Sequence, residues 1–272
     1  MKTRIDSLQN PSVKEVVRLR KRSHRDDEAL LLVEGYREVL RALDNRIPLT
    51  KLFFCKDLFL GKNEPLLVRR AEESGTAIYD CSPAVFEKIA YRDRPEGLLA
   101  ISPRRRTGLE DLRLPENPLL LVAEHIEKPG NLGTMLRSAD AAGADAIILC
   151  DKCTDVLTPN VVRASIGTIF TVPLAEATTE ETIAFLRKRG IATLAASPHA
   201  RKDFTEADMT RGVALVVGAE QYGLSETWMT EADEPVVIPM LGQADSLNVA
   251  AAATILLYEA VRQRRLAAKQ KA

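Results

Sequence analysis

The 272-residue sequence predicts an α/β protein with two domains, and three observations support this fold class. Short apolar runs alternate with segments of helical periodicity along most of the chain. A stretch with prolines at 103, 115 and 118 interrupts that alternation. No apolar run reaches the roughly 18 to 20 residues that a membrane-spanning helix needs. We therefore expect one domain over residues 1–105, a linker over 106–117 and a second domain over 118–272.

The first domain is predicted to be a small α/β unit with a largely parallel sheet. Its apolar runs indicate strands over residues 29–35, 51–57, 76–82 and 97–102. The segments between them have helical periodicity, over residues 36–45, 65–75 and 82–91. The first 24 residues are instead typical of a basic helix.

The second domain shows the apolar runs of a parallel sheet that is buried on both faces. The predicted strands cover residues 119–124, 145–151, 169–174, 191–197, 213–220 and 235–240. Helices are expected over 131–142 with Gly143 as the stop, over 179–190, and from Ser246 onward. In such a sheet the functional loops follow the carboxyl ends of the strands.

The formal net charge is zero, but positive charge is concentrated in three segments. Residues 1–25 contain eight Lys or Arg against two acidic residues, residues 104–106 are three arginines, and residues 261–271 are also basic. Such clusters favour a polyanionic partner, although a solvated helix face explains a single cluster equally well. The candidate RNA-binding residues of the first segment are Arg18, Arg20, Lys21 and Arg22.

Four cysteines are too few for a disulfide framework in a chain of this length. Cys150 and Cys153 form a CxxC pair, but no second pair or paired histidines complete a zinc site, so we expect no metal. The pair also follows a strand, whereas a thioredoxin-type motif begins a helix. The start of the chain lacks the apolar centre of a secretory signal, and we expect a cytoplasmic protein without a membrane segment.

Three loops after predicted strands concentrate glycine, asparagine or a single charge. They read "AEHIEKPGNLGTMLR", "GAEQYGLSE" and "IPMLGQADSLNVAAA". Strand-end loops of a parallel sheet can meet at one crevice, and a lining of backbone groups suits a flat polar ligand such as an adenine. The dinucleotide fingerprint, the P-loop, HExxH and GxSxG are all absent. Arg137 stands out in the first loop, because an unpaired charge inside a core is costly and this residue should reach water or a site.

The order and content of these loops resemble the SpoU/TrmH family of S-adenosylmethionine-dependent RNA ribose 2′-O-methyltransferases, within the SPOUT superfamily. The resemblance covers residues 118–265 and rests on three motifs: Asn131-Leu132-Gly133 through Arg137, Gly218-Ala219-Glu220 with Gly223-Leu224, and Ile238-Pro239-Met240 with Ser246-Leu247-Asn248. Residues 7–102, with "LLVEGYREVLRAL", resemble the substrate-binding domain that precedes many catalytic domains of this family.

The resemblance implies a trefoil-knotted catalytic domain, preceded by a small α/β RNA-binding domain, in a homodimer. It implies that the backbone at Gly218, Ile238 and Leu247 contacts S-adenosylmethionine. It also implies that Arg137 is the catalytic arginine, and that Arg163 lies near the substrate or the partner subunit. The other residues that it places in the active site are Asn131, Glu220, Ser246 and Asn248.

Structural explanations of the same residues remain open. Arg137 could pair with Asp140 or Glu220 on a helix surface, and Asn131, Ser246 and Asn248 could be helix caps. Because an arginine is a poor base, we favour Arg137 as an orienting and charge-stabilising donor.

The leading interpretation is a ribose 2′-O-methyltransferase that acts on ribosomal RNA. A tRNA methyltransferase is the nearest alternative. The others are a catalytically silent RNA-binding ribosome-assembly factor and an unrelated phosphate-binding α/β enzyme.

Overall fold

The computed structural model describes residues 2–104, 107–152 and 155–271. The chain forms two compact units, one of Met1–Arg105 with Asp155–Thr171 and one of Arg106–Thr154 with Val172–Ala272. The predicted domain division had placed residues 155–171 in the second domain. In the part of the chain that the structure describes, no helix is long and apolar enough to cross a membrane.

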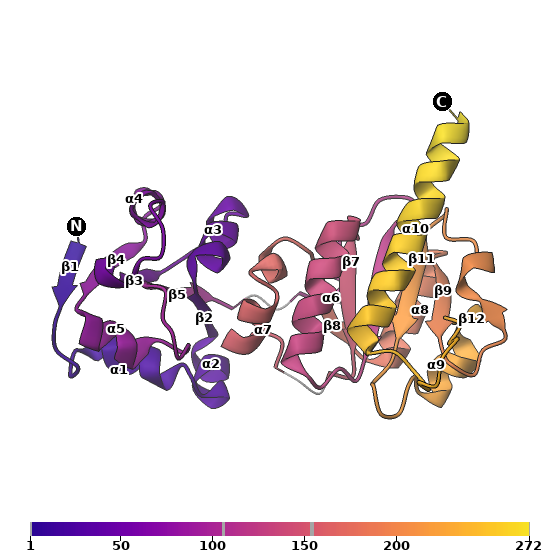
Figure 1. Ribbon diagram of the computed structural model, residues 1–272, viewed down its shortest axis with the longest axis horizontal. Helices are drawn as coiled ribbons and strands as arrows, with labels where there is room; N and C mark the ends of the chain where they lie inside the picture. Colours follow the sequence, from indigo (N-terminus) through magenta and orange to yellow (C-terminus); the bar gives the residue numbers. More distant parts are fainter. Residues whose placement is uncertain (1, 105–106, 153–154, 272) are drawn as a thin grey trace. The chain divides into compact units, whose positions relative to one another are not determined.

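The first unit is built on a five-stranded sheet with the order β1-β4-β3-β5-β2 (Figure 1). Its strands are β1 (Lys2–Ile5), β2 (Leu30–Glu34), β3 (Lys51–Phe54), β4 (Ala77–Cys81) and β5 (Leu98–Pro103). The pairs β1–β4 and β3–β4 are parallel, but β5 runs antiparallel to both β3 and β2. The expectation of a largely parallel sheet was therefore wrong at β5. An apolar run that is buried on both faces carries no information on strand direction.

Two apolar cores cover the two faces of this sheet. The helices of the unit are α1 (Pro11–Arg18), α2 (Arg22–Glu28), α3 (Tyr36–Asp44), α4 (Glu64–Glu73) and α5 (Pro83–Ile89), with a 3-10 turn η1 (Lys56–Leu58). Val16 of α1 and Phe86 of α5 belong to one core, whereas Val39 of α3 and Leu67 of α4 belong to the other. Helices α1 and α5 thus shield one face from water, and α3 and α4 shield the other.

The first 24 residues do not form one basic helix, as the charge pattern had predicted. They contain β1, then α1, which Asn10 caps through its side chain, then the start of α2. β1 is an edge strand with a single buried residue, Ile5, so the sequence offered almost no apolar pattern for it. Its Arg4 pairs with Asp80 of β4 at 2.9 Å.

Residues 155–171 pack on the first unit through α7 (Pro159–Ala164) and the 3-10 turn η3 (Thr168–Phe170). Val162 is 1% exposed and lies in the same core as Val39. Asp155 accepts a 2.7 Å bond from Arg25 in a pair whose side chains are each 4% exposed. The strand predicted over 169–174 is therefore wrong over most of its length: Ile169 and Phe170 pack against this core, and the strand begins only at Leu174.

The second unit contains a seven-stranded sheet in which every pair is parallel, with the order β10-β12-β9-β11-β6-β7-β8. The strands are β6 (Leu119–Glu124), β7 (Ala146–Cys150), β8 (Leu174–Ala177), β9 (Ala192–Ala196), β10 (Lys202–Asp203), β11 (Val213–Val217) and β12 (Glu234–Val237). Central strands β6, β7 and β11 are buried along their whole length. The predicted parallel sheet is confirmed.

In the described part of the second unit, four helices accompany the sheet, with 3-10 turns η2 (Leu109–Asp111) and η4 (Phe204–Glu206). They are α6 (Pro129–Ala142), α8 (Thr179–Lys188), α9 (Glu226–Glu231) and α10 (Val249–Lys271). α6 ends at Gly143, as predicted, and α8 has a capping box from Thr178.

α10 lies beside α6 (Figure 1). A 2.6 Å bond between the hydroxyls of Ser138 and Thr254 joins the two helices. Near the other end of α10, Arg264 donates to the carbonyl of Pro118, directly before β6. α10 thus runs from the carboxyl ends of the strands toward their amino ends. The knot implied by the resemblance stays a prediction.

Candidate active site

A carboxylate joins the three predicted loops at the carboxyl end of the second unit's sheet. Glu220, in the loop after β11, accepts hydrogen bonds from Lys128 before α6, from Asn131 in its first turn and from Asn248 before α10. The Asn131 bond measures 2.9 Å, and Asn248 also donates to Asn131 at 3.1 Å. The predicted meeting of the three loops is confirmed by these contacts.

Hydrogen bonds keep Glu220 ionised. The bond from Lys128, followed by that from Asn131, lowers the pKa of the Glu220 carboxyl below its ordinary value. A carboxylate that accepts several bonds in this way holds its donors in fixed positions. Glu220 is therefore the centre of a polar cluster that fixes the beginnings of both α6 and α10.

The two asparagines of the cluster differ in their relation to the helices. Asn248 caps α10, because its side-chain oxygen accepts from the backbone of Ala250 at 3.0 Å and of Ala251 at 3.4 Å. Asn131 is not a cap, contrary to one of its two predicted roles. α6 already begins at Pro129 with Lys128 at the cap position, so Asn131 lies inside the first turn and turns its amide to Glu220.

Arg137 is exposed and makes no hydrogen bond or ion pair with another residue that the structure describes. Pairing with Glu220, one alternative reading of Arg137, is not observed, since the oxygens of Glu220 bond to other donors. Asn131, Thr134 and Arg137 follow one another at intervals of three on the side of α6 that is not buried. Long helical side chains lean toward the helix start, so Arg137 leans back toward the loops.

The second and third loops fit a flat polar ligand such as the adenine of a cofactor. Gly218 closes the second loop on itself, since a Cβ there would lie 2.2 Å from the carbonyl oxygen of Gly223. Over residues 238–247, the backbone groups form no hydrogen bond with another described backbone group. Their donors and acceptors are therefore available to a ligand. The half-buried Ile238 and the 37% exposed Leu247 lie in this loop.

Ser246 is exposed and makes no hydrogen bond with another described residue, so neither a capping role nor a contact with the Glu220 cluster is present for it.

The predicted RNA-binding residues lie in the first unit, where several have internal partners. Arg18 pairs with Glu28 at 3.5 Å and Arg22 with Asp26 at 3.3 Å, both on exposed side chains. Arg20 donates to two carbonyls at the end of α5, those of Lys88, at 2.7 Å, and Ala90. Lys21 is exposed. Arg163 projects from α7, in the part of the chain that packs on the first unit.

Two site residues were missed by the sequence reasoning. Lys128 is one of them, and its positive charge in the first loop, two residues before Gly130, is the sequence signal that could have indicated it. Glu124, at the end of β6, is 1% exposed and accepts from Thr179 at 3.0 Å and from the backbone of Ser225 at 2.7 Å. This buried carboxylate ties the starts of α8 and α9 to the central strand.

Cys150 is buried, and burial raises the pKa of its thiol to about 12, so it is an unreactive thiol at neutral pH. Cys153, its partner in the CxxC pair, lies outside the described residues, as do Arg105 and Arg106 of the second basic cluster. Among the described residues, no group of three or more His, Cys, Asp and Glu side chains could hold a metal ion.

A parallel sheet with converging strand-end loops, an arginine without a described partner on the helix after the first loop and a second, smaller α/β unit define a two-domain α/β protein with a polar site at its strand ends. Residues 118–258 match the SpoU rRNA Methylase family, and residues 10–100 match the MRM3-like substrate binding domain. The chain belongs to the SpoU rRNA methylase family, whose members are S-adenosylmethionine-dependent RNA 2′-O-methyltransferases. S-adenosylmethionine is accordingly its methyl donor.

Three relatives place the chain within the family. It is 31% identical over 250 residues, 89% of this chain and 86% of the relative, to the 23S rRNA (uridine(2479)-2′-O)-methyltransferase of Streptomyces viridochromogenes. It is 28% identical over 254 residues, 93% of this chain and 97% of the relative, to the 23S rRNA (guanosine(2553)-2′-O)-methyltransferase RlmP of Bacillus subtilis. The crystal structure of an AdoMet-bound rRNA methyltransferase from Sinorhizobium meliloti is similar with a TM-score of 0.87 and 33% identity, covering 96% of this chain and 98% of that one.

Proposed function

We propose that this protein methylates a ribose 2′-hydroxyl in ribosomal RNA, with Arg137 as the residue that orients and stabilises the attacking oxygen. The observation that carries this proposal is the cluster around Glu220, which gathers three loops, together with the exposed Arg137 on the same helix as Asn131. The names of the relatives, which are 23S rRNA 2′-O-methyltransferases, support ribosomal RNA as the substrate.

The cofactor would lie against the backbone of Gly218, Ile238 and Leu247. When bound, it supplies an electrophilic methyl group on a sulfonium. Gly218 keeps the second loop closed, and the backbone groups of the third loop that have no described backbone partner would bind the adenine. Neither loop relies on side-chain charge for this task.

Arg137 acts on the substrate oxygen. The guanidinium stays protonated at neutral pH, so it donates hydrogen bonds and stabilises the negative charge that develops on the attacking oxygen. The proton of the hydroxyl would pass to a phosphate of the RNA substrate, because the protonated arginine cannot accept it. Glu220 holds Asn131 and Asn248, and thereby fixes the helix that carries Arg137 relative to the cofactor loops. Ser246 is exposed and has no hydrogen-bond partner among the described residues, so its hydroxyl is free to contact the reacting ribose in this proposal. Alignment of this kind supplies a large part of the rate in a transfer reaction.

The test of the Arg137 role compares Arg137→Ala with Arg113→Ala, which removes an exposed charge elsewhere in the same unit. We expect Arg137→Ala to lower methyl transfer to rRNA by at least about 100-fold, because it removes charge stabilisation in the transition state. Calorimetry should find S-adenosylmethionine binding unchanged in both variants. Turnover at the wild-type rate in Arg137→Ala would refute the assignment.

The RNA substrate is identified by labelled methyl transfer to total rRNA and total tRNA from a strain that lacks the protein. A new 2′-O-methylnucleoside in the rRNA pool supports the proposal. A new one in the tRNA pool would instead identify tRNA as the substrate. Cofactor binding without transfer to either pool, or to intact ribosomal subunits, would favour the silent assembly factor.

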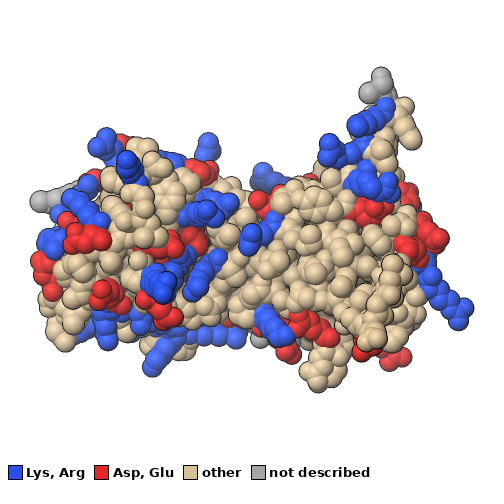
Figure 2. All heavy atoms as spheres, viewed as in Figure 1, with Lys and Arg blue, Asp and Glu red and all other residues tan. Residues whose placement is uncertain are grey.

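We further propose a cytoplasmic homodimer that associates through α10. Three large apolar side chains on this helix are exposed: Ile255 by 36%, Tyr258 by 48% and Leu266 by 47%. Figure 2 shows a broad area without charged side chains on the second unit, where Figure 1 draws the first half of α10. An exposed apolar patch of this kind favours association with another protein surface.

A further inference from the structure

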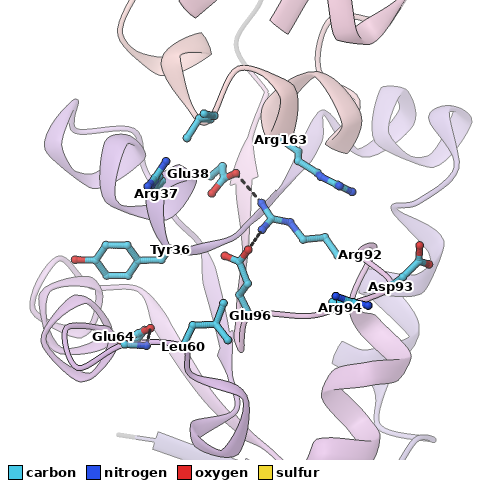
Figure 3. Close-up of a pocket in the computed structure, with 12 residues that line it drawn as sticks. Tyr36, Arg37, Glu38, Leu60, Glu64, Arg92, Asp93, Arg94, Glu96 and Arg163 are labelled. Atoms are coloured by element: carbon cyan, nitrogen blue, oxygen red, sulfur yellow. Dashed lines mark hydrogen bonds and ion pairs between the residues drawn. The ribbon is translucent and has the colours of Figure 1, made fainter. Parts of the chain in front are cut away.

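A pocket in the first unit has no role in the methyl-transfer chemistry described above. Its volume is about 800 Å³, which lies in the range of nucleotide-sized ligand sites. Figure 3 shows its side chains, which come from α3, the loops before α4 and β5, and α7. The residues that line it are Tyr36, Arg37, Glu38, Leu60, Gly61, Glu64, Arg92, Asp93, Arg94, Glu96, Arg163 and Ile166.

Arg92 forms a fixed part of the wall. Its side chain is 11% exposed and pairs with Glu38 at 2.6 Å and with Glu96, and it donates to the carbonyl of Glu34 at 3.0 Å. The carboxylate of Glu34 in turn accepts from the backbone of Tyr91 at 2.8 Å. The two glutamates of the "EGYRE" stretch thus hold the loop that carries Arg92 and Arg94 in place.

Three other arginines of the pocket are exposed: Arg37, Arg94 and Arg163. None of the three makes a hydrogen bond or ion pair with another described residue. They come from three separate segments, α3, the loop before β5 and α7. In Figure 3, Arg163 and Arg94 lie on either side of the paired Arg92.

None of the acidic residues of the pocket forms an ion pair with these three arginines in the described part of the chain. Glu38 and Glu96 are paired with Arg92. Glu64 accepts a 2.7 Å bond from the backbone of Gly61. Glu64 and Asp93 form no ion pair with another described residue, and the lining as a whole carries four arginines and four carboxylates. Glu64 is 4% exposed, whereas the three unpaired arginines and Asp93 are exposed and are the unpaired charges that a ligand can reach.

The pocket also has an apolar side. Leu60 is 77% exposed, and the half-buried ring of Tyr36 lies beside it in the lining. An exposed leucine and an aromatic ring next to guanidinium groups match a ligand with a flat, weakly polar part and an anionic part. A nucleoside phosphate has both parts.

We propose that this pocket binds one unpaired nucleotide of the RNA substrate, with the flanking phosphates at Arg37, Arg94 and Arg163 and the base at Tyr36 and Leu60. Guanidinium groups match phosphate in shape and donate two parallel hydrogen bonds. The inference rests on the proposed function for the identity of the RNA. The segment 155–171, which the catalytic family match includes, supplies one of the three arginines to the substrate-binding unit.

The test measures the binding of the full-length protein to a fluorescein-labelled single-stranded 12-nucleotide RNA and to the same strand in a duplex. The pocket variants are Arg37→Ala, Arg94→Ala, Arg163→Ala and Leu60→Ser. The matched control is Arg69→Ala, which removes an exposed, unpaired arginine of the same unit outside the pocket. Thermal unfolding verifies that each variant folds.

Each pocket arginine variant should weaken single-strand binding by about 5- to 50-fold and reduce the slope of log affinity against log salt by about one. Leu60→Ser should weaken single-strand binding more than duplex binding, because only an unpaired base can reach the apolar side. Arg69→Ala should bind as the wild type does.

The proposal is overturned if Arg69→Ala weakens binding as much as the pocket variants do, or if single strand and duplex are affected equally. Competition by free uridine or guanosine monophosphate as strong as that by the 12-nucleotide RNA would assign the pocket to a free nucleotide instead. Methyl transfer by the wild-type protein is measured separately. If the wild type methylates rRNA but the pocket variants bind RNA normally, the proposed nucleotide site is refuted and the proposed function is not. If the pocket variants lose RNA binding but the wild type does not methylate rRNA, the proposed function is refuted and the nucleotide site is not.

Discussion

At the scale of single residues, the ionisation of the Glu38 carboxyl depends on its burial and on its partner Arg92. Its side chain is 5% exposed and bonds to Arg92 at 2.6 Å. Burial raises the pKa of the Glu38 carboxyl above its ordinary value of 4.5, although the charge of Arg92 opposes this shift. A buried carboxylate costs free energy even when it is paired, which indicates a positioning role for this pair beside the pocket rather than a purely stabilising one.

Replacing Glu38 by Gln should change how stability depends on pH. Because the folded-state pKa is raised, the contribution of Glu38 to the free energy of unfolding is complete below pH 4.5 and is lost as the pH rises through the folded pKa. Glutamine does not titrate. The free energy of unfolding of Glu38→Gln should therefore increase relative to the wild type as the pH rises above 4.5, as urea denaturation at several pH values can measure.

The control for this experiment is Glu87→Gln, which removes an exposed carboxylate of α5 in the same unit. Its difference from the wild type should vary little with pH. Parallel curves for wild type and Glu38→Gln would show that the burial of Glu38 does not shift its ionisation.

At the scale of elements, the seating of α7 and η3 on the first unit depends on one glycine. Gly167 has φ +79°, and a Cβ there would lie 2.9 Å from the Cα of Glu38 in α3. Arg41 of α3 donates to the carbonyl of Ile166 beside it. The backbone at Gly167 thus lies directly against the backbone of α3. The segment 155–171, which includes Gly167, also carries Arg163 of the pocket.

Gly167→Ala should lower the free energy of unfolding by more than Gly75→Ala, a substitution at another positive φ in the same unit with nothing within 4 Å of its Cβ position. The strained backbone alone costs about 1–2 kcal/mol for a residue with a Cβ, and the contact with α3 adds about 1–3 kcal/mol. Denaturant titration of the two variants measures the difference. Equal losses would mean that α3 and the 155–171 segment tolerate the added methyl group.

At the scale of the whole molecule, the net charge says little about where RNA could bind, because the distribution of charged side chains decides this. The chain has 38 basic and 38 acidic residues, so no overall field attracts RNA. Figure 2 shows basic and acidic side chains interspersed over the first unit. RNA binding must therefore rely on local arginines that lack acidic partners, such as those of the pocket, since paired surface cations contribute little.

The proposed homodimer predicts a change of mass when α10 is made charged. The double variant Ile255→Asp with Tyr258→Asp should be a monomer, because two desolvated carboxylates would oppose burial of this face. Light scattering coupled to size exclusion gives the mass. Leu66→Asp, which charges a 60% exposed leucine of α4, should leave the mass unchanged. A dimeric double variant would move the interface away from this face of α10.

The sequence by itself determined the fold class, the parallel sheet of the second unit and the family. The apolar runs of β6, β7 and β11 are long and uninterrupted, and three motifs in order define the strand-end loops. Helix stops were also predictable where a single local signal decides, as at Gly143. These features depend on neighbours in sequence, which is why the sequence reveals them.

Only the tertiary structure decided the remaining features. The antiparallel direction of β5, the pairing of the edge strand β1 and the packing of residues 155–171 on the first unit depend on residues far away in the chain. Whether a charged side chain has a partner was also decided by the tertiary structure. Arg20 donates to carbonyls at the end of α5. The exposed arginines of the pocket have no partner among the described residues, although they line the same pocket as the paired Arg92. A charged side chain is recognisable in the sequence, but whether a partner lies within hydrogen-bonding distance is set by how distant segments fold together.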